Sequence, residues 1–233
     1  ASLAESGEIA LGDKINVVVP TGNFGNILAA YYAKKMGLPI NKLICASNVN
    51  KVLTDFIETG VYDRNRDFYA TCSPSMDILI SSNLERLLYM LTDQNDAQIR
   101  EWFGSLAETG RYEVTDDVKK VLKEEFFGGY CDDDQTKATI SEIYKKYSYT
   151  CDTHTAVAVK VYEDYKKATG DETKTLIAST ASPYKFSASV LEAIEGKKSD
   201  LDEYDMVARL AELSDIPVPS ALADLKNKER RFT

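Results

Sequence analysis

A short turn that joins a strand to a helix limits most strongly what this chain can fold into. Residues 15–19 are Ile-Asn-Val-Val-Val, a β-branched apolar run that predicts a buried strand. Residues 20–26 read Pro-Thr-Gly-Asn-Phe-Gly-Asn, and helix formers follow over 27–36. A strand, a glycine turn and a helix in this order present backbone N–H groups to an anion. The sequence therefore predicts a phosphate-binding turn.

On its glycines alone, this turn has two interpretations. Gly22 and Gly25 permit close backbone approach and positive φ angles, and Thr21, Asn23 and Asn26 add side-chain donors. A tight turn without a ligand fits the glycines equally well. Two nucleotide motifs fit poorly, because no lysine follows Gly25 as in a P-loop and no third glycine completes the dinucleotide fingerprint. The asparagine-rich turn instead favours a single phosphomonoester held by amides.

The alternation of strands and helices continues beyond this turn. Residues 43–47 predict a second strand, 49–59 a second helix and 68–71 a short third strand. Because helices alternate with strands, we expect an α/β fold with a parallel sheet and right-handed crossovers. The same pattern resumes later in the chain. Its predicted elements are a helix over 154–168, a strand over 174–179, and helices over 187–194 and 204–213.

The middle of the chain has a different pattern. Helix signals dominate, and each predicted helix begins near Asn, Asp, Thr or Gln, which are typical of a helix N-terminus. These helices cover 83–91, 96–108, 115–126 and 135–147, and Gly128-Gly129 indicates a loop. The expected division is an α/β domain formed by 1–80 and 150–200, a mostly helical insertion over 81–149, and a C-terminal helix and tail over 201–233.

Composition excludes several classes of function. The formal net charge of −9 argues against nucleic-acid binding and against docking on anionic membranes, because both need a basic face. No apolar stretch approaches the twenty residues of a membrane span. Four cysteines without a CxxC pair and one histidine argue against a zinc site. Free thiols without a secretory signal predict a cytoplasmic protein.

Residues 17–26 resemble the cofactor-phosphate loop of threonine synthases, which are fold-type II pyridoxal-phosphate enzymes. Further stretches are similar to the same family and follow in its order. They are Ser-Pro-Ser-Met-Asp-Ile at 73–78 with Ser-Asn-Leu-Glu-Arg at 82–86, His-Thr-Ala-Val at 154–157, and Ala-Ser-Thr-Ala-Ser-Pro-Tyr-Lys-Phe at 178–186. The resemblance spans most of the chain. It implies a three-layer, parallel-sheet α/β domain of the tryptophan synthase β-like class, with a mostly helical insertion.

The resemblance implies roles for individual residues. The residues that would bind the phosphate of pyridoxal 5′-phosphate are Gly22, Asn23, Phe24, Gly25 and Asn26. Thr180 would place a neutral hydroxyl against the pyridine nitrogen. That contact leaves the ring unprotonated and a milder electron sink than an aspartate partner would, which suits β,γ-elimination and replacement. On the residues alone, a helix cap or an ST turn is the alternative for Thr180.

Lys185 and His154 are further candidates for substrate binding. Lys185 would bind a substrate phosphate, and the alternative is a solvated loop lysine. His154 stands at the start of a predicted helix, where capping or packing is the alternative role. Ser73, Ser75 and Asn83 are interpreted as helix caps.

The resemblance also implies a residue that this chain lacks. A pyridoxal-phosphate enzyme needs a Schiff-base lysine, which in threonine synthases lies in a Phe-Lys-Asp type segment well upstream of the phosphate loop. Here Lys14 alone precedes the loop, in a polar lead-in to the first strand. We therefore expect no catalytic lysine in this chain. We interpret it as the C-terminal portion of a longer enzyme whose N-terminal half would be its partner.

Three functional hypotheses follow. The first is a threonine synthase, which converts O-phospho-L-homoserine and water to L-threonine and phosphate, with this chain inactive alone. The second is another fold-type II lyase, such as a serine or threonine dehydratase. The third is a non-enzymatic α/β domain that binds an anion. Residues 73–78 and 82–86, together with the helical segment, favour the first.

Overall fold

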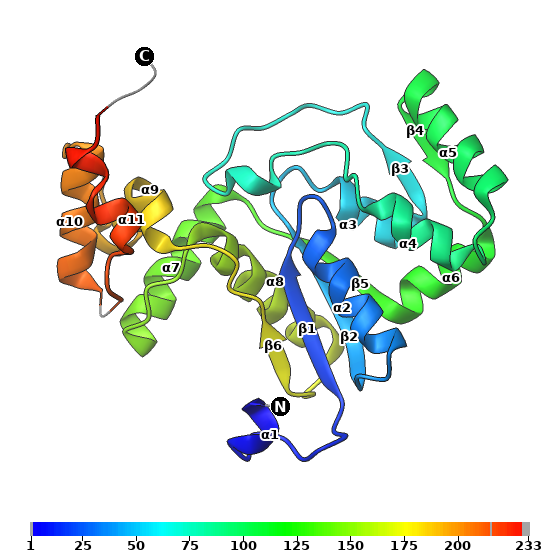
Figure 1. Cartoon of the computed structure of the whole chain (residues 1–233), viewed down its shortest axis with the longest axis horizontal. Coiled ribbons are helices and arrows are strands. Elements are labelled where there is room, and N and C mark those ends of the chain that lie inside the picture. The colour runs from blue at the N-terminus through cyan, green and yellow to red at the C-terminus, as the bar shows by residue number, and fades with distance from the viewer. Residues whose placement is uncertain (1, 215, 230–233) are drawn as a thin grey trace.

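The computed structural model describes residues 2–214 and 216–229. Residues 1, 215 and 230–233 lie outside the described residues, and with them the chain start and the end of the tail expected within 201–233. The described elements form a four-stranded parallel sheet with helices on both faces, a two-stranded antiparallel pair and a helical layer late in the chain (Figure 1).

Four parallel strands form the main sheet, in the spatial order β5-β2-β1-β6. Their bounds are Ile15–Pro20 for β1, Ile40–Ser47 for β2, Phe126–Tyr130 for β5 and Thr175–Ile177 for β6. Val18 of β1 lies beside Ile44 of β2 and Ile177 of β6. The strands expected from the β-branched runs near 15–19, 43–47 and 174–179 are confirmed, with shifts at their ends.

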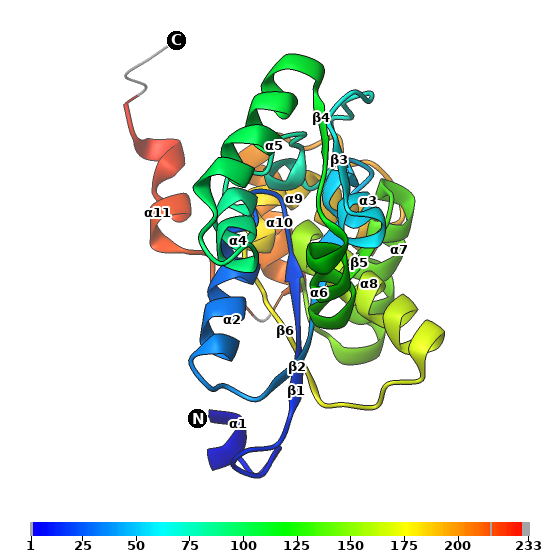
Figure 2. The ribbon, with the colours of Figure 1, turned by 90° about the vertical axis from the view of Figure 1, so that its right-hand side faces the viewer.

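Helices cover both faces of the sheet, because successive side chains of a strand point to opposite sides. Val19 packs in a core shared with α2 (Gly25–Lys35) and α3 (Val52–Thr59). Its neighbour Val18 packs with α8 (Thr153–Thr169). With the sheet seen nearly edge-on, Figure 2 shows α2 and α8 on opposite sides. The expected three-layer α/β fold with a parallel sheet is confirmed.

The prediction of a loop at Gly128-Gly129 is wrong, because these residues belong to β5. A Cβ atom on Gly128 would lie 2.9 Å from the Cα of Thr54 in α3, on one face of the sheet. A Cβ atom on Gly129 would lie 2.6 Å from Cγ1 of Val161 in α8, on the other face. The two glycines therefore allow helices to approach the strand closely from both sides.

The short strand expected over 68–71 is also wrong, since no strand is described there. Side chains accept the backbone hydrogen bonds that a neighbouring strand would otherwise take. The N–H of Tyr69 donates to Oδ1 of Asn50 at 3.0 Å, and the N–H of Thr71 donates to Oδ2 of Asp77 at 2.8 Å. The segment is therefore extended and anchored without belonging to a sheet.

The middle segment contains the expected helices together with two strands. Its helices are α4 (Leu84–Leu91), α5 (Asp96–Thr109), α6 (Asp116–Glu125) and α7 (Asp133–Tyr147). Its strands are β5 and β4 (Arg111–Glu113), and β4 pairs antiparallel with β3 (Val61–Asp63). The helix predictions are confirmed. The division into domains stays a prediction, with β5 of the middle segment placed in the main sheet.

The remaining described elements are four α-helices and three short 3-10 turns. They are α1 (Ser2–Glu5), α9 (Ser187–Glu195), α10 (Glu203–Leu213) and α11 (Ser220–Ala223), with 3-10 turns at η1 (Pro74–Met76), η2 (Pro183–Phe186) and η3 (Leu225–Asn227). Residues of α7, α9 and α10 share a third core. Within the described part of the chain, no helix has the length and apolar content that a membrane span requires.

Candidate functional site

The turn predicted to bind phosphate leaves the carboxyl end of β1 and leads directly into α2. Thr21 fixes its first residue, because its N–H donates to the carbonyl of Ala46 at 2.8 Å and its hydroxyl to the carbonyl of Val19 at 2.7 Å. The turn thus lies at the edge where ligands bind in open α/β sheets.

The backbone N–H groups of this turn have no acceptor within the described protein. None of the six consecutive N–H groups from Gly22 to Ile27 donates to a backbone or side-chain acceptor among the described residues, and the first such bond of α2 runs from Leu28 to Phe24. Free N–H groups at a helix N-terminus carry partial positive charge. The segment is therefore equipped to hold an anion, as the sequence predicted.

Phe24 carries the unusual backbone conformation of the turn. Its φ is +61°, in the left-handed region, whereas neither Gly22 nor Gly25 has a positive φ. The positive φ that these two glycines permit is therefore not adopted by either of them. Phe24 is held in this conformation because its ring is buried in the core, 5.8 Å from the ring of Phe126. Such strained conformations are found preferentially at ligand-binding sites.

Gly22 is required for a different reason, which is close contact with another segment. A Cβ atom on Gly22 would lie 2.6 Å from the carbonyl oxygen of Ser75, whereas one on Gly25 would meet only the side-chain amide of Asn83 at 3.6 Å. The carbonyls of the turn are also occupied. Ser81 donates its hydroxyl to the Gly22 carbonyl at 2.9 Å, and Asn83 donates its side-chain amide to the Asn23 carbonyl at 2.8 Å.

The expected cap role of Asn83 is therefore wrong. Asn83 occupies the N-cap position of α4, but its side chain makes no capping hydrogen bond and instead holds the turn that follows β1. Ser73 likewise precedes η1 without capping it through its side chain.

The turn lines a cavity of about 260 Å³, close to the lower limit of small-molecule sites, which is roughly 300 Å³. The structure brings together most of the residues that the sequence singled out. Those lining the cavity are Gly22, Asn23, Phe24, Gly25, Asn26, His154 and Thr180. Ser75 and Met76, which sequence reasoning did not assign to the site, form another part of the wall. Lys185 is exposed and borders a separate cavity near α10.

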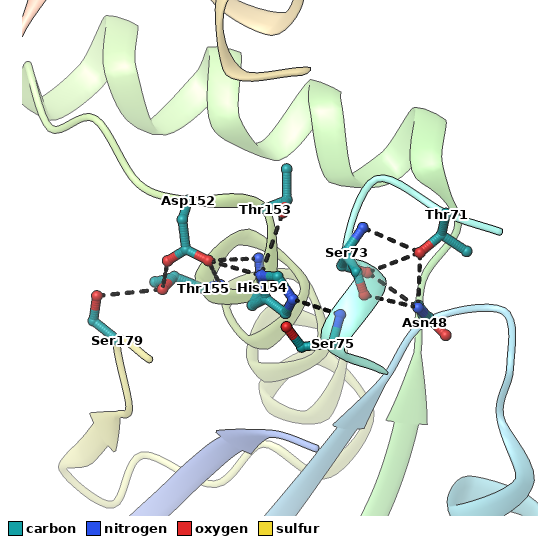
Figure 3. Close-up of polar contacts among 9 residues, drawn as sticks. All are labelled: Asn48, Thr71, Ser73, Ser75, Asp152, Thr153, His154, Thr155 and Ser179. Carbon is teal, nitrogen blue, oxygen red and sulfur yellow. Dashed lines mark hydrogen bonds and ion pairs between the residues drawn. The ribbon is translucent and has the colours of Figure 1, made fainter. Parts of the chain in front are cut away.

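His154 connects the wall of this cavity to the start of α8 (Figure 3). The backbone N–H of Ser75 donates to Nε2 of His154 at 3.3 Å. Because a backbone N–H can only donate, Nε2 is the unprotonated nitrogen, and the ring proton of the neutral imidazole lies on Nδ1. Nδ1 is 3.1 Å from Oδ1 of Asp152, which accepts that proton. His154 is buried, with 3% of its surface exposed.

Asp152 organises the N-terminus of α8. Its carboxylate accepts the backbone N–H groups of His154 and Thr155 and the hydroxyl of Thr155. The Thr155 hydroxyl lies 3.3 Å from that of Ser179, which follows β6 and precedes Thr180 (Figure 3). Burial raises the pKa of Asp152, but hydrogen bonds from His154 and Thr155 outweigh burial and hold the pKa below the ordinary 3.8. Asp152 is therefore a carboxylate at neutral pH.

A second polar cluster lies beside the first at the carboxyl end of β2. Asn48 donates its side-chain amide to Oδ1 of Asp77 at 2.7 Å and to the hydroxyl of Thr71 at 2.9 Å. The hydroxyl of Ser73 lies 3.1 Å from the same amide nitrogen (Figure 3). These bonds fix the chain just before Ser75. Sequence reasoning missed this cluster, because its members are separated by up to 29 positions and no local pattern links them.

Comparison with known proteins gives consistent results. The matching family model is described as "Threonine synthase, C-terminal" and covers residues 155–233. A Homo sapiens protein named threonine synthase-like 1 is 42% identical over 197 residues, which are 84% of this chain and 26% of that protein. Threonine synthase of Saccharomyces cerevisiae is 38% identical over 208 residues, which are 83% of this chain and 40% of that protein. The chain therefore spans less than half the length of these relatives.

The architecture gives the same result. The crystal structure of PLP-bound threonine synthase from Brucella melitensis matches with a TM-score of 0.76 and 36% identity, covering 88% of this chain and 44% of that chain. The described chain thus has the fold of the fold-type II pyridoxal-phosphate enzymes. Within that class, sequence and structure both relate it to the threonine synthases, and the predicted resemblance to their C-terminal portion is confirmed.

Proposed function

We propose that this chain supplies the cofactor-phosphate site of a threonine synthase. The whole enzyme would be a lyase that uses pyridoxal 5′-phosphate to convert O-phospho-L-homoserine and water to L-threonine and phosphate. The observation that carries the proposal is the row of N–H groups from Gly22 to Asn26, which have no acceptor among the described residues and lie in a cavity that Thr180 also lines. The compartment predicted for the enzyme remains the cytoplasm.

The residues present fit the cofactor at two points. The N–H groups of Gly22 to Asn26, at the N-terminus of α2, would hold the phosphate. Thr180 lines the same cavity and would offer its hydroxyl to the pyridine nitrogen. When bound, the cofactor supplies an electron sink for chemistry at the substrate carbons. The task of the chain is to orient the ring between an anion site and a neutral hydroxyl, which leaves the nitrogen unprotonated.

The Schiff-base lysine would come from a different segment. No lysine is among the described residues that line the cavity, and the chain matches less than half of its relatives' length. We therefore propose that the partner is an N-terminal half carrying that lysine, and that the 233-residue chain alone is inactive. Steady turnover of O-phospho-L-homoserine by the purified chain would contradict this.

The phosphate site can be tested in the chain alone with a probe that cannot react with lysines. Pyridoxine 5′-phosphate has an alcohol in place of the reactive aldehyde, and unphosphorylated pyridoxine is its matched control. At one hundred times the dissociation constant, the phosphorylated probe should stabilise the fold by about 2.7 kcal/mol. For a chain of this size, that raises Tm by roughly 5–10 °C. Equal responses to the two compounds would refute a phosphate site.

The role of Thr180 calls for a separate pair of variants. Thr180→Val keeps the side-chain shape and removes the hydroxyl, whereas Thr180→Ser keeps the hydroxyl. Thr180→Val should weaken pyridoxine 5′-phosphate about tenfold and leave inorganic phosphate binding unchanged, because the phosphate alone does not reach the ring position. Thr180→Ser should bind both probes as the parent chain does.

The substrate requires the reconstituted enzyme. Co-expression of this chain with a lysine-bearing N-terminal half should give phosphate release from O-phospho-L-homoserine. Deamination of serine or threonine in its place would support the dehydratase alternative. Lys185→Ala in the same system tests the substrate-phosphate role predicted for Lys185, which would appear as a raised KM.

A further inference from the structure

We propose that His154 is a positioning residue that shapes the cofactor-phosphate cavity by holding the Ser75 turn against Gly22. This inference rests on the proposed function and assigns a specific task within that site. The neutral imidazole would accept the Ser75 N–H through Nε2 and be oriented by Asp152 through Nδ1.

Three contacts in sequence connect Asp152 to the phosphate turn. Asp152, 1% exposed, faces Nδ1 of His154 and sets the tautomer that leaves Nε2 free to accept. Nε2 accepts the N–H of Ser75, which lines the same cavity. The carbonyl of Ser75 lies 2.6 Å from where a Cβ of Gly22 would be, so the Ser75 peptide packs directly on the glycine of the turn.

Two further contacts of the His154 ring help to keep it in this orientation. Its ring centroid lies 4.8 Å from that of Phe186 in η2, and the hydroxyl of Thr153 is 3.4 Å from Nδ1. With Asp152 on one nitrogen and Ser75 on the other, both ring nitrogens have partners within the protein. These contacts favour a positioning role over the direct substrate binding that the sequence suggested, although His154 borders the cavity.

The test compares two substitutions that differ in one acceptor. His154→Leu removes the acceptor, whereas His154→Gln can place an amide oxygen near the position of Nε2. His154→Leu should bind inorganic phosphate and pyridoxine 5′-phosphate at least about tenfold more weakly, and His154→Gln should stay within about threefold of the parent chain. Val161→Ala, at a buried position farther along α8, controls for a general loss of stability and should leave both affinities unchanged.

Two further measurements read the contact itself. Amide hydrogen exchange at Ser75 should accelerate in His154→Leu and stay slow in His154→Gln. Because the chain contains a single histidine, its imidazole ¹⁵N resonances need no assignment and should show the proton on Nδ1. A proton on Nε2 in the folded chain would overturn the proposal.

The outcomes separate this inference from the proposed function. If the parent chain binds the phosphate probes and His154→Leu binds them equally well, the positioning role is wrong and the phosphate site stands. If the two His154 variants lose affinity to the same extent, the acceptor is not what matters and the proposal is again wrong. If the parent chain shows no phosphate response, the proposed site fails, and with it any role of His154 in shaping that site.

Discussion

Two glycine-bearing segments of this chain, the turn after β1 and the strand β5, both lie against other segments but differ in the state of their backbone N–H groups. In the turn after β1, the N–H groups from Gly22 onward have no acceptor among the described residues. In β5, Gly128 and Gly129 lie in the strand and are covered by α3 and α8. Gly22, like Gly128 and Gly129, allows another segment to approach closely, but the turn also leaves backbone N–H groups without an acceptor among the described residues. What distinguishes the two segments is the neighbouring element, not the glycines.

The largest effect on stability should come from a substitution at Gly128 or Gly129, which α3 and α8 cover. Gly128→Val would force branched carbons against the backbone of α3, where a Cβ alone already lies 2.9 Å from the Thr54 Cα. We expect a loss of about 3 kcal/mol in the free energy of unfolding, measured by urea denaturation. The Tm rise caused by pyridoxine 5′-phosphate should persist at temperatures where the variant is folded. A variant as stable as the parent would show that α3 can move away from β5.

The buried carboxylate of Asp152 contacts His154, which lines the proposed phosphate cavity. This predicts a pH dependence of stability that the contacts of Gly128 and Gly129 lack. The pKa of Asp152 is lower in the folded chain than the ordinary 3.8, so its contribution is fully present above that pH and is lost as pH falls through the folded value. Asp152→Asn should cost about 2 kcal/mol at pH 7 and progressively less below pH 3.8. Urea denaturation across this range measures the difference. The cost of Gly128→Ala, used as the control, should not change with pH, and a parallel response of the two variants would contradict the assignment.

A smaller loss of stability, with a larger loss of binding, should follow from Gly22→Ala. Its Cβ would lie 2.6 Å from the Ser75 carbonyl, so one of the two segments must shift. We expect about 1–2 kcal/mol of destabilisation and at least about tenfold weaker binding of inorganic phosphate, measured by calorimetry. Unchanged phosphate affinity would show that the contact between Gly22 and Ser75 does not shape the anion site.

The smallest effect should come from Gly25→Ala, which is the matched control for Gly22→Ala. The new methyl would meet only the Asn83 amide at 3.6 Å, an ordinary contact, and the N–H is retained. We expect less than about 1 kcal/mol of change in stability and a phosphate response like that of the parent. A selective loss of phosphate binding would mean that the anion approaches Gly25 more closely than the cavity wall suggests.

Local patterns predicted much of the fold. The β-branched runs at β1 and β2, and the glycine and cap signals around most helices, are confirmed because they act within a few residues. The errors arose where a side chain outside the short pattern supplies the hydrogen-bond partner. The N–H groups of residues 69 and 71 donate to Asn50 and Asp77, so an extended segment did not become a strand.

The candidate site divides in the same way. The turn from Gly22 to Asn26 was evident from its own residues, and resemblance added Thr180. The contacts that join Asp152, His154 and Ser75 were not evident from the sequence. Ser75 lies 79 positions before His154, and the residue type does not indicate which acceptor a backbone N–H will find.

The sequence by itself determined that a strand, a glycine-bearing turn and a helix follow one another, since the residues between 15 and 35 decide that among themselves. Only the tertiary structure decided that Phe24 carries the positive φ and that the carbonyl of Ser75 packs against Gly22. It also decided that His154 accepts the N–H of Ser75. The physical reason is that burial and close contact depend on which segments meet. Residues far apart along the chain meet only after the sheet and its helices have assembled.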